Sequence, residues 1–154
     1  MHRIINRVLA AGLLLMAAGG CGFAWVNVKD TTETPGAVKV MLESHDGEDF
    51  HFAITNEGQQ PISVLVNSVK LIGPRKSVSP EVGHPFMGVG AMIESVSQGT
   101  SPTVAPGQTT SIFAHFDLDD ADIKKGDPVR IDFSAAILQA GQPVPVAPLE
   151  FQTR

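Results

Sequence analysis

The chain has 154 residues, 43% of them hydrophobic, which is long enough and apolar enough for one packed domain. Removing Arg3 and Arg7 with the first 21 residues leaves nine Lys and Arg residues against 16 Asp and Glu residues, a net charge of −7. This acidic balance excludes nucleic acid as an expected partner, because phosphate binding needs a basic surface. The single cysteine, Cys21, excludes an intramolecular disulfide and a zinc site built on thiolates.

The first 21 residues have the order of a secretory signal. Residues 1–7 carry two arginines and no acid, residues 8–18 are apolar, and small residues precede Cys21. The stretch Leu15–Cys21 (LMAAGGC) resembles a bacterial lipobox, although Ala18 stands where that family usually has a larger aliphatic residue. The resemblance implies that the signal is cut before Cys21 and that this cysteine carries the lipid.

An uncleaved membrane anchor is the alternative for the same segment. Residues 8–28 carry no charge over 21 positions, and a membrane-spanning helix needs about 20. Trp25 would then lie near the membrane interface, whereas the glycines on either side of Cys21 disfavour a helix.

Both alternatives predict the same location. The domain is expected to be tethered to a membrane of the bacterial cell envelope and to lie outside the cytoplasm, on the periplasmic side. In Gram-negative lipoproteins an Asp after the cysteine resembles an inner-membrane retention signal. Gly22 stands at that position here, so the outer membrane is favoured if the cell is Gram-negative.

Residues 22–36 are predicted to be a tether, because Lys29–Gly36 (KDTTETPG) is polar and ends in a Pro-Gly pair. A first strand is predicted over residues 37–43. The second, over residues 49–56, alternates between apolar and polar side chains, which is typical of a half-buried antiparallel strand. Its buried face is predicted to hold Phe50, Phe52 and Ile54.

Five more strands are predicted, over residues 62–72, 89–96, 108–118, 129–138 and 144–151. Asn67 and Ser68 in the first of these indicate a bulge or a change of sheet. Residues 73–88 are expected to be irregular, because they contain three prolines and no period. Residues 119–125 are expected to form one helical turn, with acids first and lysines last. Prolines in the last strand predict that it lies at a sheet edge.

Seven short strands at this spacing predict an all-β fold, an antiparallel immunoglobulin-like β-sandwich over residues 37–154. The turns Asn56-Glu57-Gly58 and Ala105-Pro106-Gly107-Gln108 resemble those of immunoglobulin-like domains in bacterial envelope proteins. The resemblance implies a fold and leaves the function open.

No motif in the chain predicts an enzyme. The G-x-S-x-G pattern of a hydrolase elbow is absent, and Cys21 belongs to the anchor. Asp119, Asp120 and Asp122 lack the ligand spacing of a calcium loop, so they are interpreted as the solvated start of a helical turn. The sequence predicts neither catalysis nor a cofactor.

Histidine and methionine side chains offer a metal-binding hypothesis. His51 and His115 are predicted to face outward on neighbouring strands, and His84 lies close to Met87, a set that would suit copper. The hypothesis requires at least three side chains to converge from the set His45, His51, His84, His115, Met87 and Met92. The alternative interpretation is that these histidines are scattered over a polar surface.

The segment His84–Gly90 (HPFMGVG) places apolar side chains among glycines inside the predicted irregular region. His84, Phe86 and Met87 are therefore candidate partner-binding residues. The alternative interpretation is that Phe86 closes the end of the sandwich. The preferred hypothesis is a membrane-tethered envelope lipoprotein that acts as a non-catalytic protein-binding or assembly module, with an envelope protein as its partner. The alternative is a periplasmic copper-binding protein.

Overall fold

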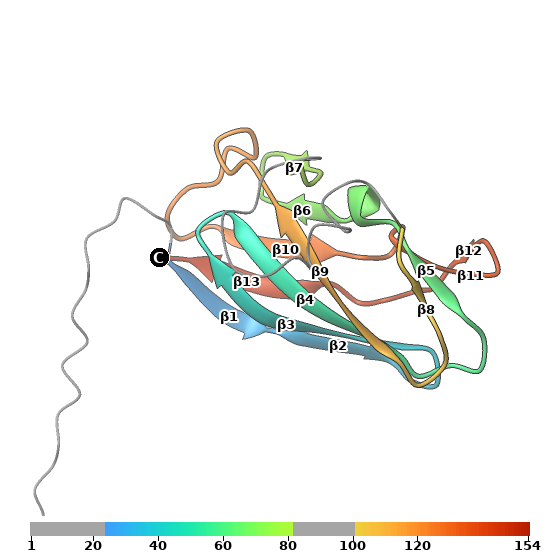
Figure 1. Cartoon of the computed structure of the whole chain (residues 1–154). Coiled ribbons are helices and arrows are strands. Elements are labelled where there is room, and N and C mark those ends of the chain that lie inside the picture. The colour runs from blue at the N-terminus through green and yellow to red at the C-terminus, as the bar shows by residue number, and fades with distance from the viewer. Residues whose placement is uncertain (1–23, 82–100) are drawn as a thin grey trace, which may run out of the picture.

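The computed structural model describes residues 24–81 and 101–154, in which antiparallel strands form three sheets (Figure 1). The first sheet has the order β1 (Trp25–Lys29), β13 (Leu149–Thr153), β10 (Pro128–Asp132), β6 (Lys70–Ile72) and β7 (Ser77–Val78). The second has the order β2 (Thr31–Thr34), β3 (Val38–Asp46), β4 (Asp49–Asn56) and β9 (Thr109–His115). The third has the order β12 (Gln142–Pro143), β11 (Ile137–Gln139), β5 (Ile62–Val64) and β8 (Thr103–Val104).

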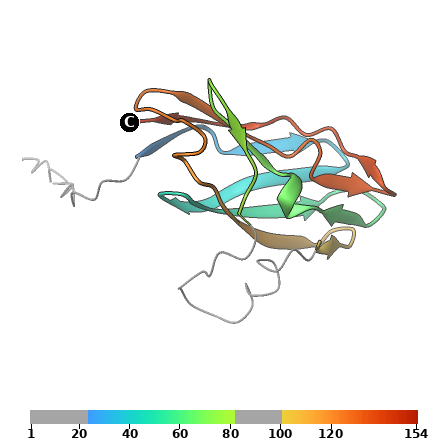
Figure 2. The ribbon, with the colours of Figure 1, turned by 90° about the horizontal axis from the view of Figure 1, so that it is seen from above.

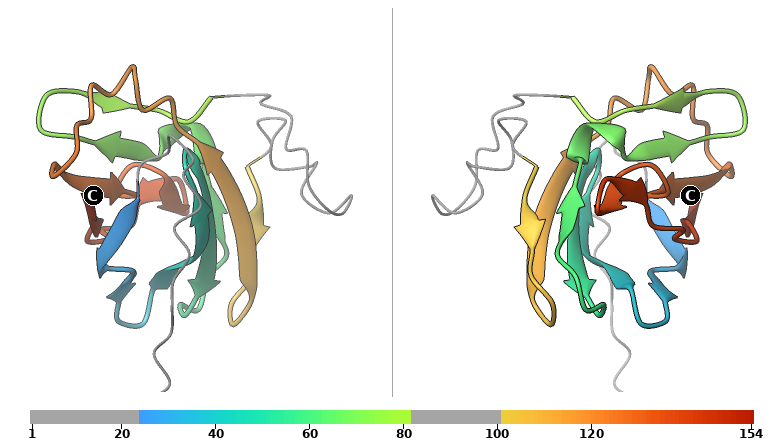
Figure 3. Two further views of the ribbon diagram at one scale, coloured as in Figure 1. Left: turned by 90° about the vertical axis from the view of Figure 1, so that its left-hand side faces the viewer. Right: turned by 90° about the vertical axis from the view of Figure 1, so that its right-hand side faces the viewer.

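The first and second sheets lie face to face, as the views from above and from the ends show (Figures 2 and 3). The third sheet lies at the end of the molecule away from the C-terminus (Figure 1). The described elements are strands apart from one 3-10 turn, η1 (Val66–Ser68). The expected all-β sandwich is confirmed, with more and shorter strands than the seven predicted.

The core between the first and second sheets includes the face of β4 that was predicted to be buried. Phe50, Phe52 and Ile54 are all 0% exposed, as the period of two requires of the buried face. The sheet opposite contributes buried residues from β6, β10 and β13: Leu71, Val129, Ile131, Leu149 and Phe151. Burial of this alternating set from both sheets is what holds the two layers together.

Two of the predicted strands are each divided between two sheets, and for one of them the sequence predicted a bulge or a change of sheet at the point of division. The expected strand over residues 62–72 is divided by η1 at Asn67 and Ser68, which places β5 in the third sheet and β6 in the first. The expected strand over residues 129–138 is likewise divided into β10 and β11. The two crossings are adjacent, because the N–H of Leu65 donates to the carbonyl of Ala136 at 2.7 Å.

The predicted tether over residues 22–36 is wrong for its described part. β1 pairs with β13 and β2 pairs with β3, so both strands belong to the domain that was expected over residues 37–154. Trp25 is 9% exposed instead of lying at a membrane interface, and its indole N–H donates to the carbonyl of Gly47 at 2.8 Å. β2 is an edge strand that buries only Thr32, which explains why its sequence is so polar.

The final strand also differs from its prediction. β13 lies between β1 and β10 instead of at an edge, and it starts only after Pro145 and Pro148. Since neither proline is in the strand, every residue of β13 has an N–H available for the ladder. The edge position beside it belongs to β1.

Three further expectations concern residues 119–125, 73–88 and 89–96. A turn over residues 118–122 replaces the helical turn expected over residues 119–125, with hydrogen bonds from the N–H of Ala121 to Asp117 O (3.2 Å) and from that of Asp122 to Asp119 O (3.0 Å). β7 occupies part of the region expected to be irregular. The strand expected over residues 89–96 lies outside the described residues.

Candidate functional site

The outer face of the second sheet carries two of the predicted metal-binding histidines. β4 and β9 are neighbours, as expected, and their register pairs His51 with Phe113 and Asp49 with His115. The two histidines therefore share a face as diagonal neighbours instead of directly opposing each other. The ring of His51 contacts that of Phe113, with 5.1 Å between their centroids.

His115 is held by carboxylates. Its Nδ1 lies 2.6 Å from Asp49 Oδ1, and its Nε2 lies 3.9 Å from Glu48 Oε2. The other carboxylate oxygen of Glu48 accepts a hydrogen bond from the N–H of Leu118 at 3.0 Å. This arrangement orients the imidazole and fixes the end of β9 against the turn between β3 and β4.

His45 does not join this group. It pairs with the buried Phe50 in the register between β3 and β4, so it lies on the opposite side of the sheet from His51. Partial burial lowers the pKa of His45, and the neighbouring Asp46 carboxylate acts in the opposite direction. The neutral imidazole is therefore the favoured form at pH 7.

The remaining residues of the lipid-anchor, metal-binding and partner-binding hypotheses lie outside the described ranges. Cys21, His84, Phe86, Met87 and Met92 are not among the described residues, so their proposed roles stay predictions. Within residues 24–81 and 101–154, no three side chains of His, Cys, Asp or Glu are placed to hold a metal ion. The same ranges contain no helix long and apolar enough to cross a membrane.

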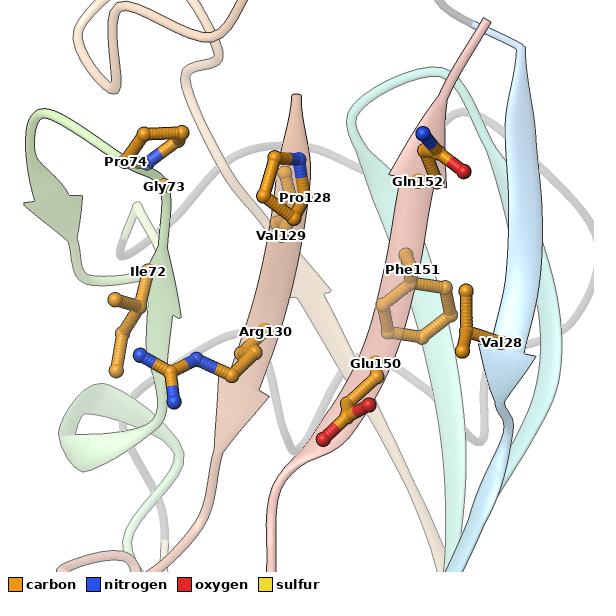
Figure 4. A pocket seen from close by; sticks show the side chains of 10 residues that line it. All are labelled: Val28, Ile72, Gly73, Pro74, Pro128, Val129, Arg130, Glu150, Phe151 and Gln152. Carbon is orange, nitrogen blue, oxygen red and sulfur yellow. The ribbon is translucent and has the colours of Figure 1, made fainter. Parts of the chain in front are cut away.

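A groove of about 470 Å³, which the sequence did not predict, lies on the outer face of the first sheet (Figure 4). It is lined by β1, β10 and β13, and by β6 with the turn that follows it. Its size falls in the range of known ligand sites, roughly 300–1,000 Å³. Four strands from three distant parts of the chain form it, so no local sequence pattern indicates it.

The groove combines apolar and charged side chains. Ile72 and Pro74 lie on one side, and Val28, which is 63% exposed, lies on the other (Figure 4). Arg130 and Glu150 are direct partners in the register between β10 and β13, so opposite charges stand side by side between the apolar groups. The surface thus offers apolar contact together with both a donor and an acceptor.

A cluster around Arg75 joins two loops at one end of the sandwich. The Arg75 guanidinium contacts Asp122 Oδ2 at 2.9 Å, donates to Asp122 O at 2.8 Å and pairs with the Asp127 carboxylate. The pKa of Asp127 is lowered by the hydrogen bond from the N–H of Lys124, and Arg75 acts in the same direction. The cluster fixes the loop that precedes β10.

These features define the class of the protein as an all-β sandwich with a groove on the outer face of its first sheet. No family model matches the chain, and no curated protein matches it. The chain is similar to the crystal structure of ycdA, a candidate lipoprotein of Bacillus subtilis, with a TM-score of 0.56 and 12% sequence identity. The likeness covers 80% of this chain but only 38% of that protein. At this identity it shows the sandwich fold alone.

Proposed function

We propose that this chain is a bacterial envelope lipoprotein, anchored through Cys21, whose β-sandwich is a non-catalytic protein-binding or assembly module. The observation that carries the anchor is the position of β1. Because Trp25–Lys29 pairs with β13, these residues are not available to a membrane-spanning helix. Ala24 is likewise held, because its carbonyl accepts a hydrogen bond from the N–H of Arg154. The uncharged run left for such a helix is residues 8–23, a run of 16 positions where about 20 are needed.

Two further points support this proposal. The lipobox-like stretch ends at Cys21, only three positions before Ala24, whose carbonyl accepts a hydrogen bond from the N–H of Arg154. The structurally similar ycdA is itself described as a candidate lipoprotein, which agrees with a sandwich of this kind held at a membrane. The proposed location is the outside of the cytoplasmic membrane or, in a Gram-negative cell, the periplasmic side of the outer membrane.

Replacing Cys21 with serine tests the anchor. We expect the full-length wild type to incorporate labelled fatty acid and to lose its first 20 residues by mass, whereas Cys21→Ser incorporates none and keeps them. The acyl chains would hold the wild type firmly, since each buried methylene contributes about 0.8 kcal/mol. Gly22→Ala is the matched control, and it should be acylated and cleaved like the wild type. Labelled fatty acid in Cys21→Ser would contradict the proposal.

The groove supports the binding part of the proposal. Among the described residues, the exposed large hydrophobic side chains are Val28 at 63% and Met41 at 41%. Val28 lines the groove, next to further apolar groups and a pair of opposite charges. Met41 is on β3 of the second sheet. Apolar side chains around a few polar groups are typical of a surface that binds a segment of another protein.

A pair of charge substitutions tests whether the groove binds a partner. The intact protein is purified from detergent-solubilised membranes, and stoichiometric co-purifying proteins are identified by mass spectrometry. We expect Val28→Glu to lose the partner at least about tenfold, because a carboxylate in an apolar contact is costly to desolvate. Met41→Glu, at an exposed site on the other sheet, should retain it. If only Met41→Glu lost the partner protein, or if no partner co-purified with the wild type, the groove would not be the binding surface.

A further inference from the structure

The start of β1 is fixed to one end of the sandwich. The carbonyl of Ala24 accepts a hydrogen bond from the N–H of Arg154 at 2.7 Å. The next residue, Trp25, donates its indole N–H to Gly47 O and packs edge-on against Phe50 at 5.4 Å between ring centroids. The chain therefore belongs to the folded domain from Ala24 onward.

Three segments surround this starting point. The turn between β3 and β4 contacts it through Gly47, and the end of β13 pairs with β1. The loop Lys124–Asp127 joins the same end, because the N–H of Gly126 donates to Thr153 O at 3.0 Å and Thr153 Oγ1 donates to Lys124 O at 2.7 Å. We call these segments the anchor end. In Figure 1 they lie by the C-terminus, opposite the third sheet.

The chain between the proposed lipid and this end is very short. Cys21 and Ala24 are three positions apart, so the connection spans at most about 11 Å even when fully extended. The nine-residue strand β3, which runs from near the far end to the anchor end, is about 30 Å long by comparison. The covalent connection is therefore much shorter than the sandwich.

We infer that the anchor end contacts the headgroup surface of the membrane and that the third sheet is the part of the domain farthest from it. This inference rests on the proposed lipid anchor at Cys21. The contacting surface is a lipid headgroup layer, and the short covalent connection holds the domain there. Charge attraction does not hold it there, because residues 46–49 and 117–127 at this end hold eight acidic residues, whereas the basic residues are Lys124, Lys125 and, at the end of β13, Arg154. The groove then opens sideways, toward a partner in or beside the same membrane.

The chain is well suited to a test with single fluorescent labels. Cys21 is its only cysteine, and acylation removes that thiol, so an introduced cysteine is the one site for labelling. Lys125 at the anchor end and Gln59 after β4 at the far end are both exposed. Substitutions at such positions usually change stability by no more than about 0.5 kcal/mol. Unchanged urea midpoints would verify this.

The acylated full-length protein, labelled at Lys125→Cys or Gln59→Cys, is reconstituted in phosphatidylcholine vesicles that carry a headgroup-attached nitroxide quencher. We expect quenching at residue 125 to exceed that at residue 59 by at least about twofold, since the two sites differ in distance from the bilayer by roughly the length of β3. Equal quenching, or stronger quenching at residue 59, in protein that floats with the vesicles overturns the inference and leaves the lipid anchor standing. Protein that does not float, or that floats with an unacylated Cys21, overturns the proposed anchor instead.

Discussion

Replacing Phe50 with alanine is expected to lower the free energy of unfolding by about 3–5 kcal/mol. Phe50 is 0% exposed, and its ring lies within 5.4 to 6.1 Å, between centroids, of five other rings: those of Trp25, His45, Phe52, Phe116 and Phe151. Two of these belong to the opposite sheet, in β1 and β13. The truncation would leave a cavity between the sheets that these rings cannot fill without leaving their own contacts.

The measurement is urea unfolding followed by circular dichroism. Phe50→Leu keeps most of the buried volume and is expected to lose less than the alanine variant. Met41→Ala is the surface control on the same sheet, where a change within about 0.5 kcal/mol is expected. If Phe50→Ala loses less than about 1 kcal/mol, the contact between β1 and the core is not as the structure describes it.

Replacing Asn56 with alanine is expected to cost about 3 kcal/mol or more of unfolding free energy. Asn56 is 0% exposed, and its side-chain amide donates to the carbonyls of Gln60 and Val104, each at 2.8 Å. Its side-chain oxygen accepts the N–H of Gly58 at 2.9 Å. Alanine would remove these three bonds. The N–H of Gly58 keeps its bond to Ala37 O at 3.0 Å, so the cost comes from the carbonyls of Gln60 and Val104, at about 1–3 kcal/mol for each buried group left without a partner.

Asn56→Asp separates hydrogen bonding from packing, because it has nearly the same shape. Its second oxygen would face two carbonyl oxygens that need a donor, so it is expected to destabilise at least as much as alanine does. Thr55→Ala is the control one position away, where an exposed bond to Thr109 is lost and a change of about 1 kcal/mol or less is expected. An Asn56→Asp variant as stable as the wild type would show that the amide donates no buried bonds.

Asn56 also shows how much of the fold was readable in the sequence. The turn after β4 was predicted from Asn56, Glu57 and Gly58, and the structure shows the same asparagine closing it with its side chain. The sequence does not reveal that Asn56 reaches across to Val104, which is 48 positions later. Turn chemistry is local and therefore visible in the chain, whereas the partner of a side chain depends on how distant segments pack.

The candidate site was less predictable than the fold. The sequence placed His51 and His115 on neighbouring strands, and the register between β4 and β9 bears this out. It did not indicate that Phe113 and Asp49 would be their partners. Pairing depends on the alignment of two strands, and a shift of one residue would change every neighbour.

The sequence by itself determined the all-β class, the buried face of β4 and an interruption of the run 62–72 at Asn67 and Ser68. These features follow from the alternation of side chains along a strand, which is set by the backbone of each segment alone. Tertiary structure alone decided that β1 and β2 belong to the domain, that β13 is an inner strand and that a groove lies across the first sheet. The pairing of segments up to 128 positions apart creates these features, and a polar or short strand gains its stability only from such partners.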